Sequence, residues 1–312
     1  MGTVFVTQRL PDGGLDPLTH AGHEIRPRAA DTPVPHDELC AAAADAIVCL
    51  LTDRIDAEVV AAGAPRLKVV ANVAVGYDNV NVGAASAAGV VVCNTPGVLD
   101  ETTADLAFTL ILAASRRLGE AEADLRAGRW TGWGIGQYLG QDVHGAILGV
   151  VGWGRIGSAV GRRAAGFGME VLHHARCPTG DPGYVGDLDD LFRRSDVISL
   201  HVPLTDETHH LVDARRLSLM KPTAVLVNTA RGPVVDEEAL AVALEAGQIF
   251  AAGLDVYEHE PVVHPRLLAA PRTVLLPHIG SASLATRTRM ARMAAADVVA
   301  VLAGRPPAHP VG

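Results

Sequence analysis

The sequence is poor in cysteine and lysine. Only four of its 312 residues are cysteines, and they form no C-x-x-C pair, so neither a disulfide framework nor a cysteine zinc site is expected. We expect inert thiols in a reducing compartment and predict no metal site. Lysine occurs only at positions 68 and 221, and the formal net charge is −9 without a basic cluster. This charge balance argues against nucleic acid or an anionic membrane surface as the main partner.

Long hydrophobic runs are also lacking. No uncharged apolar stretch reaches the ~18 residues that a membrane-spanning helix needs. The N-terminal segment TVFVT has neither the basic region nor the long apolar region of a signal peptide. We therefore expect a soluble cytoplasmic protein. Because 49% of the residues are hydrophobic, the chain can form two packed domains or one large one.

Short apolar runs alternate with helical patterns along the whole chain. Nearly continuous β-branched runs are typical of strands buried on both faces, and they predict strands at 4–6, 46–51, 67–73, 90–94, 146–152, 170–174, 197–202, 224–230, 250–256 and 273–277. Apolar residues at helical spacing predict helices at 38–45, 56–63, 155–167, 187–194, 213–220, 236–246 and 284–303, and one long helical stretch over 100–127. This βαβ rhythm predicts an α/β fold with parallel sheets.

The long helical stretch joins two βαβ series, which suggests two α/β domains. The final helix follows the second series but could return to the first domain. The chain would then cross the domain boundary twice, and the cleft between the domains would be the natural ligand site.

A glycine fingerprint follows the strand predicted at 146–152. The segment GVVGWGRIG places G-x-G-x-x-G at Gly152, Gly154 and Gly157, between a strand and a helix. In this context the first glycine permits a tight turn, the second lets the backbone approach a pyrophosphate, and the third lets the helix pack against the strand. The helix N-terminus then offers N–H groups to the phosphates. The pattern predicts a dinucleotide site.

The acid that selects NAD is missing from its usual place. It is expected about 20 residues after the fingerprint, where this chain has Ala175 and Arg176, and no carboxylate occurs between Glu170 and Asp181. A carboxylate there would repel a 2′-phosphate, whereas Arg176 can pair with one. The sequence therefore favours NADPH, with NAD as the alternative if Arg176 only points into water.

Three residues capable of acid–base or anion-binding chemistry follow predicted strands. Arg231 offers a planar fork for a carboxylate, His278 suits proton donation near neutral pH, and Glu260 could orient the histidine and favour its charged form. Ligands of parallel sheets bind beyond the carboxyl ends of the strands. Each residue alone is weak evidence, since there are 13 histidines and a lone arginine is usually a surface ion pair. Together with the fingerprint they predict reduction of a 2-keto acid.

The segments VGWGRIG, HVPLTDET, NTARGPVVDEEAL, GLDVYEHEP and LPHIGSAS together resemble the D-isomer-specific 2-hydroxyacid dehydrogenases. NVAVGYDNVN at 72–81 and NTPGVLDETTADLAF at 94–108 match the same family in order and spacing, so the resemblance covers most of the chain. It implies a flavodoxin-like substrate-binding domain (1–97 plus 285–312) and a Rossmann NAD(P)-binding domain (98–284), both doubly wound. Family members are typically homodimers through the cofactor domain, and the arm Trp130–Leu139 could reach across that interface.

The resemblance also implies roles for single residues. Arg231 would bind the substrate carboxylate or carbonyl, His278 would be the general acid–base, and Glu260 would pair with it. Leu51 and the backbone N–H groups of Val75 and Gly76 would contact the substrate. The expected cofactor contacts include Thr103 and the 153–156 turn at the pyrophosphate and Asp255 at the nicotinamide carboxamide; the full set is Thr103, Gly152, Trp153, Gly154, Arg155, Ile156, Gly157, Ala175, Arg176, Cys177, Pro203, Thr208, Thr229, Ala230, Asp255 and Gly280.

Within the family, AVGYDN and the ARC segment at 175–177 point to the glyoxylate/hydroxypyruvate reductases. Cys177 stands where a hydroxyl often helps to hold the 2′-phosphate, which weakens the NADPH prediction, and Val75 replaces the lysine of phosphite dehydrogenases. Two alternatives stay open. One is another D-2-hydroxyacid dehydrogenase that uses NADH, of the D-lactate or phosphoglycerate type. The other is a dinucleotide-sensing scaffold like the transcriptional corepressors of this fold, against which the compact chain argues.

Overall fold

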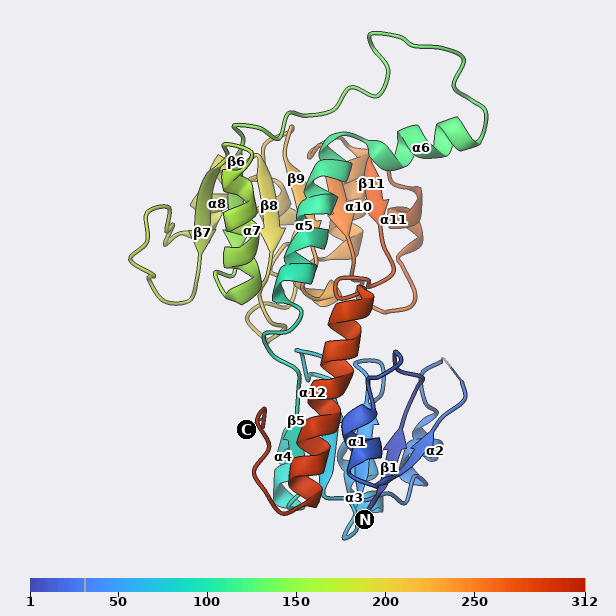
Figure 1. Cartoon of the computed structure of the whole chain (residues 1–312). Helices are drawn as coiled ribbons and strands as arrows, with labels where there is room; N and C mark the ends of the chain where they lie inside the picture. The colour runs from blue at the N-terminus through green and yellow to red at the C-terminus, as the bar shows by residue number, and fades with distance from the viewer. Residues whose placement is uncertain (31, 312) are drawn as a thin grey trace. The chain divides into compact units, whose positions relative to one another are not determined.

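The computed structural model describes residues 1–30 and 32–311. The chain divides into two compact units (Figure 1). The first unit comprises Met1–Leu99 and Ser281–Gly312, and the second comprises Asp100–Gly280. The last helix therefore belongs to the first unit, and the chain passes between the units twice.

The first unit contains a parallel five-stranded sheet with the strand order β2-β1-β3-β4-β5. Its strands are β1 (Thr3–Val6), β2 (Glu24–Pro27), β3 (Ala46–Cys49), β4 (Val69–Asn72) and β5 (Val91–Cys93). Numbered along the chain this is the order 2-1-3-4-5, which defines a flavodoxin-like sheet. The predicted fold class of this unit is confirmed.

The second unit contains a six-stranded sheet with the order β11-β10-β9-β8-β6-β7, and every pair of neighbours is parallel. Its strands are β6 (Ile147–Val151), β7 (Glu170–His174), β8 (Val197–Leu200), β9 (Val225–Asn228), β10 (Ala251–Leu254) and β11 (Thr273–Leu275). The chain order reverses between β6 and β8, so the topological switch point of this Rossmann-type sheet lies at their carboxyl ends.

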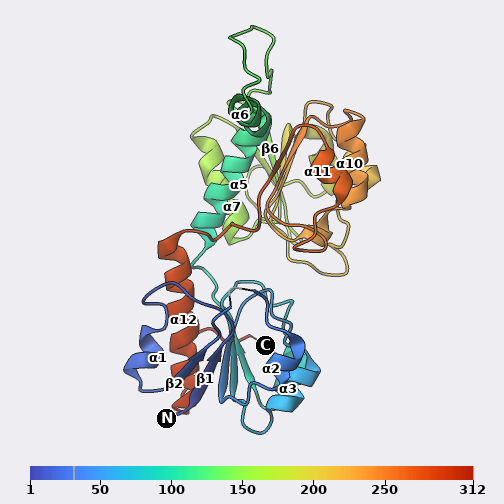
Figure 2. The same cartoon turned by 90° about the vertical axis from the view of Figure 1, so that its right-hand side faces the viewer.

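Helices cover both faces of each sheet (Figure 2). In the first unit α1 (Asp16–His20) and α12 (Leu284–Leu302) lie on one face, and α2 (His36–Cys40) and α3 (Ala57–Gly63) lie on the other. In the second unit α5 (Asp100–Ser115) and α7 (Arg155–Ala165) lie opposite α10 (Glu237–Glu245) and α11 (Pro265–Ala269). The remaining helices are α4 (Val82–Ala87), α6 (Leu118–Arg126), α8 (Leu188–Arg194), α9 (Ala214–Leu217) and the 3-10 turn η1 (Gly232–Val234).

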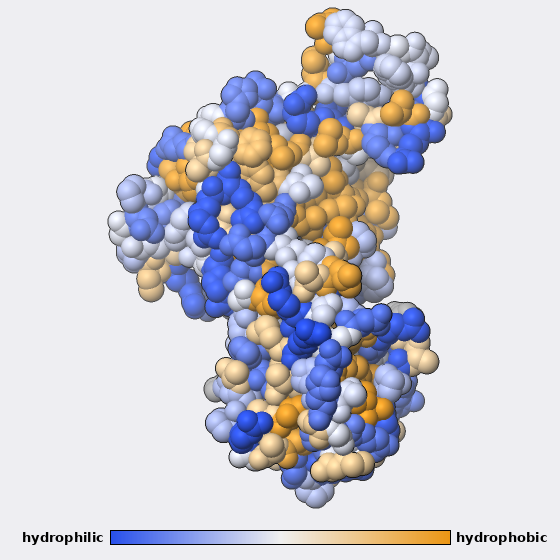
Figure 3. All heavy atoms as spheres, in the orientation of Figure 1, coloured by the Kyte–Doolittle hydropathy of each residue, from blue (hydrophilic) through white to orange (hydrophobic). Residues whose placement is uncertain are grey.

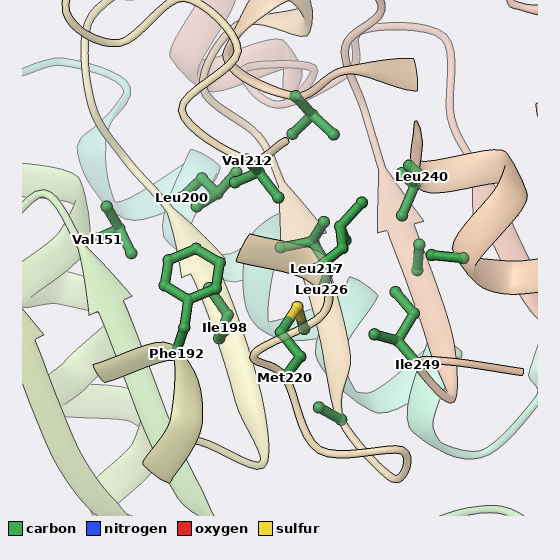
Figure 4. Close-up of a cluster of buried hydrophobic side chains, with 14 of the residues drawn as sticks. Val151, Phe192, Ile198, Leu200, Val212, Leu217, Met220, Leu226, Leu240 and Ile249 are labelled. Carbon is green, nitrogen blue, oxygen red and sulfur yellow. The ribbon is translucent and has the colours of Figure 1, made fainter. Parts of the chain in front are cut away.

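Strand residues of the second unit supply its two hydrophobic clusters alternately. Val225 and Val227 of β9 belong to the cluster under α5 and α7, whereas Leu226 belongs to the cluster on the opposite face. Figure 4 shows Leu226 in that second cluster with Ile198 and Leu240. Because both faces are buried, the strands read as continuous apolar runs, which is why they could be located in the sequence.

Three predictions about elements were wrong. The single helix over 100–127 is two helices, because Arg117 adopts a left-handed conformation (φ 53°) and the carbonyl of Ser115 accepts a hydrogen bond from the Gln141 amide at 2.8 Å. The helix at 38–45 ends at Cys40, and Ala43 has a φ of 42°. The edge strand β2 was not predicted.

Among the described residues, no helix is both long and apolar enough to cross a bilayer.

Candidate active site

The glycine turn after β6 forms at the switch point, and its first and third glycines have no room for a side chain. Gly152 has a φ of +98°, and a Cβ there would lie 2.6 Å from the carbonyl oxygen of His201, the residue after β8. A Cβ on Gly157 would lie 2.0 Å from the Gly152 carbonyl oxygen. Both distances are far below van der Waals contact. The two glycines therefore allow the turn to fold and α7 to begin directly beside β6.

Gly154 differs from the other two glycines because none of the described residues comes within 4 Å of the place where its Cβ would be. It is the N-cap residue of α7, and no side chain in the described part of the chain caps this helix. Space at the second glycine and an uncapped helix N-terminus are what a pyrophosphate requires. Arg155, the first residue of α7, pairs with Asp100 of α5 at 3.2 Å between Nε and Oδ2. The turn thus fits a dinucleotide.

The segment after β7 carries the residues expected to select the cofactor. Ala175 is half-buried, and Arg176 and Cys177 are exposed. The first carboxylate downstream, Asp181, accepts a hydrogen bond from Trp153 Nε1 at 3.2 Å. The Trp153 ring also stacks on His173 at 4.1 Å between ring centroids. These contacts join the glycine turn to the loop that follows β7. The two segments expected to contact the adenosine ribose are therefore held together.

Two threonines expected at the cofactor have different surroundings. The Thr208 hydroxyl donates to the Pro203 carbonyl at 2.6 Å and accepts from the Thr205 amide at 2.8 Å, so it orders the loop after β8. Thr229 follows β9, and its buried hydroxyl has no hydrogen-bond partner within the described residues. A buried hydroxyl without a partner is unfavourable, and a bound cofactor would supply one.

His278 and Glu260 meet at the carboxyl end of the sheet. Nδ1 of His278 lies 2.8 Å from Oε2 of Glu260, and both side chains are about one quarter exposed (26% each). Oε1 of Glu260 accepts from the Tyr257 amide at 3.1 Å. Burial alone would raise the pKa of Glu260, but His278, the Tyr257 amide and the Arg231 charge lower it overall. Glu260 is therefore an anion at neutral pH, and it holds the histidine through Nδ1 rather than through Nε2.

Asp255 holds the loop that carries His278. It is fully buried, and its two oxygens accept from the amides of Ile279 at 2.7 Å and Gly280 at 2.8 Å. The carbonyl of Gly280 accepts from the hydroxyl of Thr103, a buried residue of α5, at 3.4 Å. His278 itself has a positive φ of 54°. Asp255 and Thr103 were expected to contact the cofactor, and here they support the backbone beside the histidine.

Arg231 begins a turn that packs very closely on the segment bearing Glu260. A Cβ on Gly232 would lie 1.8 Å from the carbonyl carbon of Tyr257, so only glycine fits. Asn228 shapes the turn, since its side chain donates to the Arg231 carbonyl at 2.9 Å and accepts from the Ala230 amide at 3.0 Å. Arg231, Glu260 and His278, which lie far apart in sequence, are thus brought to neighbouring loops of one unit.

The expected substrate contacts Leu51, Val75 and Gly76 lie in the first unit, in loops after β3 and β4. The carbonyl of Val75 accepts from the Asn94 side chain at 2.7 Å, and that of Gly76 from the Asn72 side chain at 2.8 Å. The sequence reasoning missed these two buried asparagines. Asn94 ends the apolar run at 90–94 and Asn72 lies one residue before the end of the run at 67–73, and those positions were the only signal available.

Comparisons with known proteins agree with this geometry. The family model described as D-isomer specific 2-hydroxyacid dehydrogenase, NAD binding domain, matches residues 108–280. A glyoxylate reductase of Thermococcus gammatolerans is 46% identical over 97% of this chain and 94% of its own length.

Two solved structures are similar over nearly the whole chain. One is a protein of Thermus thermophilus, with a TM-score of 0.95 and 46% identity over 99% of this chain and 100% of that one. The other is a Sinorhizobium meliloti NADPH-dependent glyoxylate/hydroxypyruvate reductase in complex with NADP and malonate, with a TM-score of 0.84 and 36% identity over 99% of this chain and 96% of that one.

The Rossmann-type sheet, its fingerprint and the matching NAD-binding family model together identify an oxidoreductase that depends on a nicotinamide dinucleotide. The chain belongs to the D-isomer-specific 2-hydroxyacid dehydrogenase family.

Proposed function

We propose that this chain is an NADPH-preferring reductase of small 2-keto acids, which converts glyoxylate to glycolate and hydroxypyruvate to D-glycerate. The observation that carries the proposal is the hydrogen bond between His278 and Glu260, 2.8 Å long, in the unit that holds the dinucleotide fingerprint. The relatives named glyoxylate reductase support the substrate class. The substrate side chain is then no larger than a hydroxymethyl group.

Each catalytic residue has a distinct task in this proposal. The nicotinamide ring, when bound, supplies hydride to the carbonyl carbon. His278 donates the proton that the carbonyl oxygen then needs. Glu260 holds Nδ1, so that Nε2 is the nitrogen that donates. Arg231 binds the substrate carboxylate through its planar fork.

The preference for NADPH rests on the residues after β7. Ala175 puts no negative charge where a 2′-phosphate would approach, and the exposed Arg176 can pair with one. The nearest downstream carboxylate, Asp181, is bonded to Trp153. The NADP complex of the Sinorhizobium meliloti enzyme supports the same preference.

The test is a steady-state panel of small 2-keto acids, each measured with NADPH and with NADH. We expect the highest kcat/KM for glyoxylate or hydroxypyruvate with NADPH. His278→Ala should lower kcat by about 10²-fold or more, the scale of an acid–base group. His144→Ala, which removes an exposed histidine of the same unit, is the matched control and should leave kcat unchanged. Near-normal turnover of His278→Ala would disprove the mechanism. Preference for a longer keto acid would disprove the substrate class.

A further inference from the structure

A cluster of metal-binding side chains lies in the first unit, on α2 and α3, outside the catalytic residues. His36 and Cys40 are four residues apart in α2 and so share one helix face. Glu58 comes from the first turn of α3, which packs beside α2 (Figure 2). One ligand atom from each of the three residues lies within 4.8 Å of the other two.

The distances approach those of a bound ion. Nδ1 of His36 lies 3.9 Å from Sγ of Cys40. Tetrahedral zinc with a Zn–S bond of about 2.3 Å and a Zn–N bond of about 2.1 Å places these two atoms roughly 3.6 Å apart. Glu58 is exposed, so its carboxylate can close the remaining gap by changing rotamer. The site therefore needs only small side-chain movements.

Asp56 supports the histidine in the way that metal sites require. Nε2 of His36 lies 3.1 Å from each carboxylate oxygen of Asp56, so Nδ1 is turned toward Cys40. The other nitrogen of a metal-binding histidine almost always donates to a carboxylate or carbonyl, which fixes the ring and raises its basicity. Asp56 is itself fixed, because it caps α3 by accepting from the amides of Glu58 and Val59, both at 3.1 Å, and it pairs with Arg54 at 3.0 Å.

We propose that His36, Cys40 and Glu58 bind a zinc-type divalent cation, with water completing its coordination. The mixed nitrogen, sulfur and oxygen ligands suit a borderline-soft ion and are unsuited to magnesium or calcium. The negative charges of Glu58, Asp56 and Asp37 act on the Cys40 thiol and add to the attraction for a cation. The ion would join α2 to α3 and stabilise that face of the first unit. It has no part in hydride transfer. The absence of cysteine pairs led to the prediction of no metal site, and it does not reveal this cluster, which combines a histidine and a cysteine of one helix with a glutamate of the next.

Cobalt(II) is the probe, since a cobalt–thiolate bond gives a near-ultraviolet charge-transfer band and tetrahedral cobalt absorbs strongly in the visible. The titration uses the whole 312-residue chain in a Cys177→Ser background, because Cys177 is the exposed cysteine among the four. We expect a band that saturates at one equivalent, disappears on adding zinc, and is absent in Cys40→Ser. His36→Asn should weaken binding by at least tenfold, and Glu58→Gln should do so less strongly.

Glu58→Gln keeps the test interpretable if either α2 variant folds poorly, since Glu58 is exposed. Glu38→Gln, on α2 but outside the cluster, is the matched control and should titrate like its parent. Zinc should raise the Tm of the parent and of Glu38→Gln, and raise that of Cys40→Ser far less. The proposal is overturned if the parent shows no charge-transfer band. It is also overturned if Cys40→Ser keeps the band, or if Glu58→Gln binds as tightly as Glu38→Gln.

Discussion

Ala175 and Arg176 are the residues on which the choice between NADPH and NADH is expected to depend. Ala175→Asp combined with Arg176→Leu introduces a carboxylate for the ribose hydroxyls and removes the cation for the 2′-phosphate. The ratio of kcat/KM for NADPH to that for NADH should fall by about tenfold or more, which corresponds to ~1.4 kcal/mol of binding free energy. Steady-state kinetics with both cofactors measures the ratio.

Asp181→Asn provides the control for this change. Asp181 is the next carboxylate along the chain, but it is bonded to Trp153, so its removal should leave the ratio nearly unchanged. If Asp181→Asn shifts the ratio and the double variant does not, the selecting residue is Asp181 and Arg176 is a surface residue.

The Glu260 carboxylate should make the protein less stable as the pH falls into the acid range. Its pKa is lowered below its ordinary value of 4.5. A lowered folded pKa stabilises the protein fully above that ordinary value, and the stabilisation is lost as the pH falls through the folded pKa. Glu260→Gln should therefore lower the Tm at pH 7, and the difference from wild type should shrink below pH 4.5. Its kcat should fall, but less than that of His278→Ala.

Thermal melts across the acid range test this expectation, with Glu122→Gln as an exposed control. The Tm difference between wild type and Glu260→Gln is compared at neutral pH and at a pH about one unit below the ordinary pKa of a glutamate. If the difference is the same at both pH values, the charge of Glu260 contributes nothing to stability.

At the scale of single residues, the sequence indicated which side chains could carry out the chemistry. It did not indicate which hydrogen bonds hold those side chains in place. Arg231, Glu260 and His278 stood out because they follow predicted strands, and strands of a parallel sheet end at one edge. The bonds from Asp255 to the amides of Ile279 and Gly280 did not stand out, because they depend on loop conformation. An acid just past a glycine-containing strand can contact a ligand, a backbone or both, and its backbone contacts depend on a loop conformation that the sequence does not reveal.

Two glycines in the turn between β6 and α7 are expected to have different roles. Substituting one should weaken cofactor binding, and substituting the other should lower the stability of the fold. Gly154→Ala adds a methyl group into open space at a φ that alanine tolerates (−90°), so the Tm should stay near that of wild type. The methyl group would occupy the place of the pyrophosphate, and the cofactor KM should rise about tenfold, or ~1.4 kcal/mol. Isothermal titration with NADPH measures the loss directly.

Gly157→Ala is the opposite case within the same turn. Its Cβ would lie 2.0 Å from the Gly152 carbonyl oxygen, so α7 must move away from β6 at a cost of about 1–3 kcal/mol of unfolding free energy, or more. Equal effects of the two alanines on Tm would contradict the assignment of Gly154 as the phosphate-facing glycine.

Elements were predictable where burial set their pattern. Buried strands gave continuous apolar runs, and ten of the eleven strands found in residues 1–30 and 32–311 overlap a predicted range. The eleventh, β2, has the sequence EIRP and is mostly exposed at the sheet edge, so no apolar run marks it. The break between α5 and α6 was invisible for another reason. Apolar spacing continues through Arg117, and the break is made by Gln141, a residue far along the chain that bonds the Ser115 carbonyl.

At the scale of the whole molecule, the arm Trp130–Leu139 of the second unit has the features of an interaction surface. Figures 1, 2 and 3 show α6 and the loop after it projecting from the rest of that unit. Four large hydrophobic residues of this loop are more than half exposed to solvent: Trp130 (53%), Trp133 (80%), Ile135 (82%) and Leu139 (64%). Apolar groups gathered on a projecting segment mark an interaction surface, and a second copy of the same chain is the partner that symmetry favours. We therefore propose a homodimer held partly by this arm.

The dimer predicts a change of mass when the arm loses its apolar side chains. Light scattering coupled to size exclusion should give twice the monomer mass of 32.5 kDa for the wild-type chain. Trp133→Ser combined with Ile135→Ser should shift the mass toward the monomer, because it removes the two most exposed apolar groups of the arm while leaving the buried core intact. Leu268→Ser, which removes an exposed leucine (61%) of α11 in the same unit, controls for a general loss of surface hydrophobicity and should remain dimeric. A wild-type mass of one chain at micromolar concentration, or a dimer that survives the double substitution unchanged, would show that the arm serves something other than self-association.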